Sequence, residues 1–373
     1  MRLIYIANMR LPTEKAHGLQ IMKMCEIFAR QGMKVELVVP WRFNFIKENP
    51  FEYYGVEKNF KITKIFSFDL VRFGKVGFLI QSFSFAKVVL YYLLFKKADV
   101  IYSRDILPLF WLSFFKTNLF WEVHTGVFNF AIKRVLKKCN GVISISQGLK
   151  FFYINNGVNP DKILVSTDGV DIKMFQISSS KIQVREKLNL PLDKKIILYT
   201  GHLYEWKGAQ VLAEASKFLG DDCLLVFVGG TEKDVKKFKI KNLKLKISVV
   251  GHRPYKEIPL WLKAADVLVL PNSAKEKISE LYTSPLKLFE YMASGVPIVA
   301  SNLSSIREIL KDGENAVLVK PDSPVCLTEG IMKVLKNPDF SDKVSKQAYS
   351  DAGEYTWNKR GEKIMEFIYD RQT

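Results

Sequence analysis

Residues 282–300 read YTSPLKLFEYMASGVPIVA, which is a loop, a helix and a buried strand in succession. Ser284 is a favourable N-cap, Pro285 suits the first helical position, and Gly295 ends the helix before the apolar strand. The start of such a helix offers free backbone N–H groups and the positive end of the helix dipole. This stretch therefore predicts an α/β unit with an anion site where the helix begins.

The alternation of short apolar strands with helices begins twice along the chain. The expected strands are residues 3–7, 35–39, 100–103, 119–123 and 141–146 in the first half, and 195–200, 224–228, 247–250, 267–270, 297–300 and 316–319 in the second. This alternation predicts parallel sheets covered by helices, which bind ligands at the carboxyl ends of their strands. We expect two doubly wound domains, residues 1–175 and 190–355, with a hinge in 173–190.

The composition agrees with a folded protein of two ordinary domains, because 48% of the 373 residues are hydrophobic and 25% are charged. The four cysteines lie far apart, at positions 25, 139, 223 and 326. They indicate neither a disulfide framework nor a zinc site, and a reducing cytosol fits best. The apolar run at the N-terminus is too short for a signal peptide and is expected to be a strand.

A net charge of +18 implies attraction to polyanions. The densest basic run, residues 233–246, carries no nucleic-acid-binding motif, so we rank a membrane surface or a lipid-linked substrate above nucleic acid. Residues 76–95 approach the length of a membrane-spanning helix, but Gln81 and Lys87 lie inside them. We expect a core helix there, with a helix lying on the bilayer surface as the alternative.

Two further features concern the anion site. Lys207 follows the strand at 195–200 and stands at the start of a helix, where a cation is disfavoured unless an anion binds beside it. Gly201, in the same loop, permits a close backbone approach. Glu290 lies one turn into the helix that follows Pro285, where it either accepts hydrogen bonds from ribose hydroxyls or pairs with Lys287 on the surface.

Seven segments together resemble glycosyltransferase family 4, which has the GT-B fold, and they follow the family's order along nearly the whole chain. They are KAHGLQIMKMCEIFARQG (15–32), WEVHTG (121–126), ISISQGL (143–149), DGVDIKMF (168–175), GHLYEWKG (201–208), VVGHRPYKEIPLWLKAADVLVLPN (249–272) and TSPLKLFEYMASGVPIVAS (283–301). The resemblance implies two Rossmann-like domains whose parallel sheets face across an interdomain cleft. It also implies a C-terminal helix, about residues 356–373, that joins the first domain.

The resemblance assigns roles to individual residues. Lys207 would neutralise a diphosphate, Glu290 would hold the ribose as the second glutamate of the family's EX7E motif, and His124 would reach the transferred sugar. Gly18 matches a glycine-containing loop near the phosphates. The other donor contacts that the resemblance implies are Gly201, His202, Arg253, Tyr282, Thr283, Ser284, Pro285, Leu286 and Lys287.

Two positions depart from the family's pattern. Tyr282 stands where the first glutamate of the EX7E motif is expected, and Glu280 is nearby but out of register. His202 replaces the usual arginine of the donor loop, and Lys287 is the residue that would supply the missing charge. A TSPLK form of the motif occurs within the family, so these departures do not imply a dead enzyme.

The implied activity is that of a retaining glycosyltransferase, of hexosyltransferase type, acting by front-face displacement without a metal or other cofactor. The expected donor is a UDP- or GDP-linked sugar, and the expected acceptor is a glycan or a lipid-linked molecule of cell-envelope polysaccharide biosynthesis. Such an enzyme would lie in the cytoplasm, peripheral to the inner face of an anionic membrane. Two alternatives remain open, a GT-B nucleotide-sugar epimerase and a catalytically silent, membrane-associated nucleotide-binding scaffold.

Overall fold

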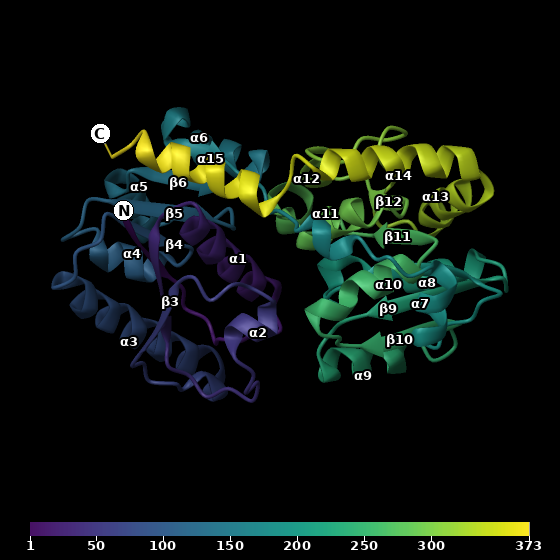
Figure 1. Ribbon diagram of the computed structural model, residues 1–373, viewed down its shortest axis with the longest axis horizontal. Helices are drawn as coiled ribbons and strands as arrows, with labels where there is room; N and C mark the ends of the chain where they lie inside the picture. The colour runs from purple at the N-terminus through teal and green to yellow at the C-terminus, as the bar shows by residue number, and fades with distance from the viewer. Residues whose placement is uncertain (373) are drawn as a thin grey trace. The chain divides into compact units, whose positions relative to one another are not determined.

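The computed structural model describes residues 1–372, which form two compact units. The first unit comprises Met1–Thr167 together with the C-terminal stretch from Trp357, and the second comprises Asp168–Thr356. Figure 1 colours the chain from purple to yellow, so that the yellow C-terminal helix α15 is seen among the purple and blue elements of the first unit. Each unit is built on one parallel sheet, as the sequence predicted.

The first unit has a seven-stranded sheet in the order β3-β2-β1-β4-β5-β6-β7. Its strands are β1 (Arg2–Ile6), β2 (Lys34–Pro40), β3 (Lys61–Ile65), β4 (Val100–Ser103), β5 (Leu119–Val123), β6 (Gly141–Ser144) and β7 (Ile163–Val165). All neighbours pair in parallel, and β1, β2, β4, β5 and β6 are almost wholly buried. The sequence interpretation missed β3 and β7, because both are partly exposed edge strands that lack a continuous apolar run.

The helices of the first unit are α1 (Ala16–Arg30), α2 (Pro50–Tyr54), α3 (Gly74–Leu94), α4 (Ile106–Leu112), α5 (Phe130–Lys138), α6 (Gln147–Asn155) and α15 (Trp357–Tyr369). Helix α15 packs against α1, whereas α3 packs against α4 and α4 against α5. At Gly361 the helices α15 and α1 approach so closely that a Cβ atom would lie 2.3 Å from the Ile27 side chain. The last helix is therefore an integral part of the first unit.

The second unit has a six-stranded parallel sheet in the order β10-β9-β8-β11-β12-β13. Its strands are β8 (Lys195–Thr200), β9 (Cys223–Val228), β10 (Ile247–Gly251), β11 (Val267–Leu270), β12 (Ile298–Ser301) and β13 (Val317–Val319). Its helices are α7 (Lys181–Lys187), α8 (Ala209–Ala215), α9 (Glu232–Lys241), α10 (Ile258–Ala264), α11 (Leu286–Ser294), α12 (Ser304–Arg307), α13 (Pro324–Lys336) and α14 (Pro338–Ala352). Helix α11 is the predicted helix of residues 282–300, and its inner face lies in the core between the sheet and α14.

The stretch expected as a hinge, residues 173–190, contains a helix with a capping box. Ser180 caps α7, and the Gln183 side chain bonds back to the Ser180 N–H. Arg185 is buried in this helix, where it donates to the Ala264 carbonyl and pairs with Asp266 at the N-terminal end of β11. These contacts hold α7 against α10 within the second unit.

Each sheet has a switch point where the strand order reverses. In the first unit the reversal lies between β1 and β4, and in the second it lies between β8 and β11. The chain leaves adjacent strands in opposite directions there, so a crevice opens at their carboxyl ends. The loops after these four strands are therefore the places to look for a ligand site.

Candidate functional site

The switch point of the second unit brings two distant stretches of sequence together. The loop after β8 carries Gly201 and ends in Lys207, and the chain after β11 leads to the start of α11. Ser273 N–H donates to the Trp206 carbonyl over 2.9 Å, and Pro271 lies so close to Gly208 that a Cβ there would be 1.6 Å from the Pro271 oxygen. Glycine is thus required at position 208, which also has a positive φ of 70°.

Two lysines and a glutamate gather at this switch point. Lys287 and Glu290 lie one turn apart on α11 and are both buried, and the charges of Lys207, Lys287 and Glu290 act on one another. The Lys287 ammonium lies 3.8 Å from the centre of the Tyr199 ring, and it has no hydrogen-bond partner among residues 1–372. A buried ammonium without a hydrogen-bond partner is costly, which indicates a place for a bound anion.

The protonation states of this cluster reflect its burial. Burial lowers the pKa of Lys207 to about 8, although the nearby Glu290 carboxylate opposes the shift. Burial, reinforced by the charge of Lys207, holds the pKa of Lys287 well below its usual value. Burial raises the pKa of Glu290 to about 7, against hydrogen bonding from the Tyr255 hydroxyl and the charges of both lysines. A dianionic ligand would reverse the shifts on both lysines.

The structure corrects two expectations about α11. Ser284 was expected to be the N-cap and Pro285 the first helical residue, but the helix begins at Leu286, and the Ser284 hydroxyl instead accepts a hydrogen bond from the Asp168 N–H over 3.0 Å. A surface ion pair between Glu290 and Lys287 was the alternative to a ribose contact. It is wrong, because both side chains are buried and no such pair forms within the described residues.

The other predicted donor contacts lie in separate segments of the second unit. Tyr282 ends a short π-helix, Ile278–Tyr282, which also contains Glu280, and residues 283–286 are half-buried. The His202 ring stacks on Tyr204 at 4.9 Å, and the His202 carbonyl accepts a hydrogen bond from Tyr199. Arg253 is exposed in the loop after β10. No contact in the described structure links Arg253 to the lysines.

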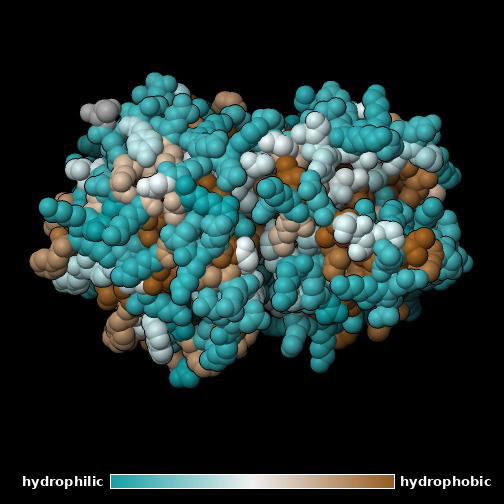
Figure 2. Space-filling model, in the orientation of Figure 1, coloured by the Kyte–Doolittle hydropathy of each residue, from teal (hydrophilic) through white to brown (hydrophobic). Residues whose placement is uncertain are grey.

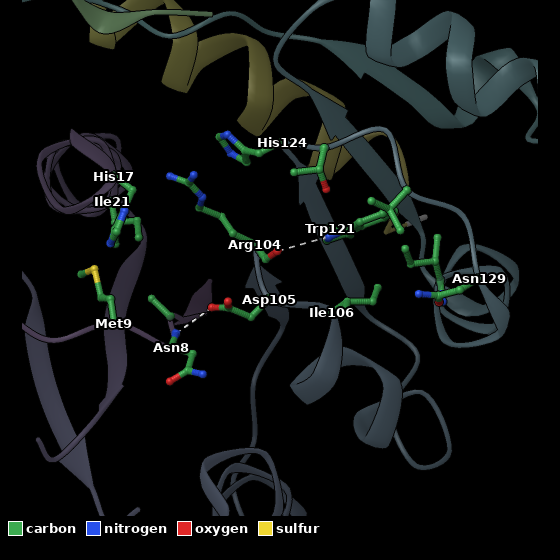
Figure 3. Close-up of a pocket in the computed structure, with 14 residues that line it drawn as sticks. Asn8, Met9, His17, Ile21, Arg104, Asp105, Ile106, Trp121, His124 and Asn129 are labelled. Carbon is green, nitrogen blue, oxygen red and sulfur yellow. Dashed lines mark hydrogen bonds between the residues drawn. The ribbon is translucent and has the colours of Figure 1, made fainter. Parts of the chain in front are cut away.

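The switch point of the first unit holds a cavity of about 380 Å³. The cavity is lined by Ala7, Asn8, Met9, His17, Ile21, Arg104, Asp105, Ile106, Trp121, His124, Thr125, Val127, Asn129 and Ile132. Figure 3 shows the Arg104 guanidinium between the rings of His17 and His124, and Asp105 bonded to the Asn8 N–H. These polar groups follow β1, β4 and β5, as expected for ligands of an open parallel sheet.

His124 is held by a fully buried carboxylate. Its Nε2 lies 2.7 Å from Glu122 Oε1. Glu122 is shielded completely from solvent and also contacts Gln20, the Tyr102 hydroxyl and Arg360. The Arg360 charge and the hydrogen bond to His124 hold the pKa of Glu122 well below its usual value despite burial. Because Glu122 is ionised, it fixes the orientation of the His124 ring.

Both histidines of the cavity are neutral at physiological pH. Burial and the charge of Arg104 lower the pKa of His17 to about 3, and burial and the same charge lower the pKa of His124 to about 4. Arg104 makes one side-chain hydrogen bond, of 2.5 Å to Gln20 Oε1, within the described residues. The cavity therefore combines one guanidinium with two neutral imidazoles, which suits it to a polyhydroxylated ligand.

Gly18 lies in the first turn of α1 and not in a loop, which corrects that expectation. A Cβ atom at this position would be 2.2 Å from the Tyr54 hydroxyl and 2.7 Å from Thr13. The Tyr54 hydroxyl bonds to both backbone groups of Thr13 and so fastens the chain before α1. The glycine is thus explained by packing in the first unit.

Several polar residues of the two switch points were missed from the sequence, including Asn8, Thr125 and Asn129 in the lining of the first cavity. His17, Arg104 and Asp105 line the first cavity, and Asn272, just after β11, is buried with neither of its amide atoms bonded within residues 1–372. The signal available for Arg104, Asp105 and Asn272 was their position just after β4 or β11, at the carboxyl edge of the sheet, whereas His17 lies in the first turn of α1. Recognising it required the strand order, which brings β4 next to β1.

Two parallel doubly wound sheets, each with polar groups at its switch point, define the GT-B class of fold. Solved structures agree over almost the whole chain. A structure of Anabaena HepE in complex with UDP and glucose matches with a TM-score of 0.79 at 17% identity, covering 99% of both chains. The lipopolysaccharide biosynthesis glycosyltransferase WaaG matches with a TM-score of 0.74 at 16% identity, covering 98% of this chain and 99% of that one.

Within this fold class, residues 180–351 match the family model of the Glycosyl transferases group 1. An uncharacterized glycosyltransferase of Methanocaldococcus jannaschii is 26% identical over 64% of this chain and 60% of its own length. A putative teichuronic acid biosynthesis glycosyltransferase, TuaC of Bacillus subtilis, is 28% identical over 63% and 58%. A D-inositol 3-phosphate glycosyltransferase of Corynebacterium diphtheriae is 25% identical over 57% and 51%. The chain thus spans between half and two thirds of the length of these relatives.

Proposed function

We propose that this protein is a retaining glycosyltransferase that transfers a hexosyl group from a UDP- or GDP-linked sugar to a glycan or lipid-linked acceptor. The observation that carries the proposal is the buried Lys287 ammonium without a hydrogen-bond partner, beside Lys207 and Glu290 at the start of α11. Two cations at a helix N-terminus form a site for a diphosphate. The group 1 domain match, the HepE structure with UDP and the glycosyltransferase relatives support this donor class.

In this proposal the second unit holds the donor. Lys207 and Lys287 bind the diphosphate and stabilise the charge that develops on it as the glycosidic bond breaks. Glu290 accepts hydrogen bonds from the ribose hydroxyls, and the Tyr255 hydroxyl positions its carboxylate. Gly201 has a φ of 121°, and a Cβ atom at this position would lie 3.9 Å from Cδ of Lys287. The backbone of the loop therefore passes close to the Lys287 side chain.

The first unit takes the acceptor in its cavity. The neutral His124 and His17 rings can exchange hydrogen bonds with sugar hydroxyls, and Arg104 adds a fork of donors. Glu122 holds the His124 ring through Nε2, which leaves Nδ1 as an acceptor for a hydroxyl proton. The acceptor hydroxyl attacks the anomeric carbon on the face from which the diphosphate leaves, so the configuration is retained.

The test is calorimetric titration of UDP, GDP and UDP-glucose into the wild type and into single variants. Lys207→Ala and Glu290→Gln are expected to weaken binding of the preferred nucleotide by about tenfold to a hundredfold, as loss of a charged hydrogen bond implies. Lys256→Ala removes an exposed lysine of the same unit and serves as the matched control. If Lys207→Ala and Glu290→Gln bind the nucleotide as tightly as the control Lys256→Ala does, the assignment of the donor site is wrong.

A further inference from the structure

Helix α3 carries apolar side chains on its exposed side as well as on its buried side. The side chains it buries include Gln81 and Ser82, which bond to the two side-chain atoms of Asn8 over 2.9 and 3.0 Å. Its exposed side carries Val76 (68% exposed), Leu79 (55%), Ile80, Phe83 (47%), Tyr91 (65%) and Leu94. These six residues recur at helical spacing along one stripe, which we call the α3 face. A helix that served only to cover the core would expose a polar side to solvent.

Apolar side chains continue beyond the helix. Phe66 and Phe68, more than half exposed, precede α3 and contact each other at 5.1 Å, and the Phe68 N–H donates to Ser84 of the helix. Phe43 is 73% exposed, and its N–H donates to Asp69 in the same segment. Figure 2 shows apolar side chains at the surface of the first unit in the region where Figure 1 draws α3. Contiguous exposed apolar surface of this kind marks an interaction site.

The charges around this surface have one sign. No acidic residue occurs in residues 70–98, whereas that stretch contains five basic ones. Lys96 is neutralised by Glu36, but Arg72, Lys75, Lys87 and Lys97 are exposed and form no ion pair with any carboxylate of residues 1–372. Lys87 lies in the α3 face itself, where its long aliphatic stem can extend along the apolar surface.

We propose that the α3 face docks the protein onto an anionic lipid bilayer, with the helix lying in the plane of the headgroups. The apolar stripe would enter the boundary between headgroups and acyl chains, and the four unpaired cations would meet anionic headgroups. A second copy of the chain is a poor occupant of this face, because the four cations of one copy would then lie against the same four cations of the other. Spanning is excluded by the hydrogen bonds that tie Gln81 and Ser82 to Asn8 in the first unit.

The test is cosedimentation of the full chain with vesicles of phosphatidylcholine alone or with about 30% phosphatidylglycerol, at about 50 and about 500 mM salt. The wild type is expected to bind the anionic vesicles, more weakly at high salt, and to bind the neutral ones little. The variant Lys75→Gln/Lys87→Gln is expected to bind the anionic vesicles about 25-fold more weakly, since each basic residue contributes about fivefold. Leu79→Ser/Phe83→Ser is expected to bind at least about tenfold more weakly at either salt concentration.

The matched control is Lys233→Gln/Lys237→Gln, which removes two exposed cations of helix α9 in the densest basic run of the chain. It is expected to bind anionic vesicles like the wild type. Circular dichroism and thermal unfolding, measured on every variant, report folding of both units independently of membrane binding. The proposal is overturned if the wild type ignores anionic vesicles, if the α9 control loses as much binding as the α3 variants, or if Leu79→Ser/Phe83→Ser only dissociates a dimer.

Discussion

Lys287→Met is the most informative single substitution at the donor site, because it should change stability and affinity in opposite directions. Methionine keeps most of the length of the side chain and removes its nitrogen. That nitrogen is buried without a hydrogen-bond partner, and such a group costs about 1–3 kcal/mol in the empty protein. Loss of the contact with Tyr199, 3.8 Å away, offsets part of the gain.

The expected net effect on the empty protein lies between zero and about +2 kcal/mol of stability, or a rise in Tm of up to about 8 °C for the second unit. UDP binding should weaken by about tenfold to a hundredfold, because a charged hydrogen bond to the diphosphate is lost. Thermal unfolding with and without UDP measures both quantities, and Lys256→Met is the matched control. A destabilised Lys287→Met protein that binds UDP as tightly as the wild type would refute the anion site.

Three further expectations concern other groups. Lys207 has a lowered pKa of about 8 and must be protonated to bind a diphosphate, so UDP affinity should fall as the pH rises above 8. Calorimetry between about pH 7 and 9.5 checks this, and an affinity that does not fall above pH 8 would contradict it. Glu122→Gln removes the buried carboxylate charge that pairs with Arg360 and should destabilise the first unit by about 3–5 kcal/mol in urea unfolding; a loss below about 1 kcal/mol would show the pair to be dispensable. Gly18→Ala should destabilise the same unit through its clash with Tyr54, and wild-type stability would mean that the tyrosine moves aside at no cost.

Local patterns predicted the strands of both sheets well. Strands such as β4, β5 and β8 are continuous apolar runs, and their bounds match the expectation. Lys207 lies in the loop after β8, and Lys287 and Glu290 lie in the first turns of α11. The three residues come close together because β8 and β11 are neighbours in the sheet. The half-exposed edge strand β3, with its sequence KITKI, gives no such signal.

Features that depend on contacts between residues far apart in the chain could not be predicted from the sequence. The Ser284 hydroxyl was expected to cap α11 but bonds to Asp168, 116 residues away. Arg104 and His17 meet only because β4 pairs with β1, across about a hundred residues of sequence. Helix α3 was expected to be a core helix because polar residues such as Gln81 and Lys87 interrupt its apolar run. Only the contacts of Gln81 show which side faces inward.

The central claim is that the second unit binds a nucleotide diphosphate sugar for transfer to another molecule. Its most direct test is incubation of the protein with UDP-glucose or GDP-mannose and a lipid-linked glycan extract, followed by NMR of the products. The account predicts release of the nucleoside diphosphate together with a new glycoside whose anomeric configuration equals that of the donor, both lost in Lys207→Ala. An epimerised nucleotide sugar, or no turnover of either donor with acceptor present, would contradict it.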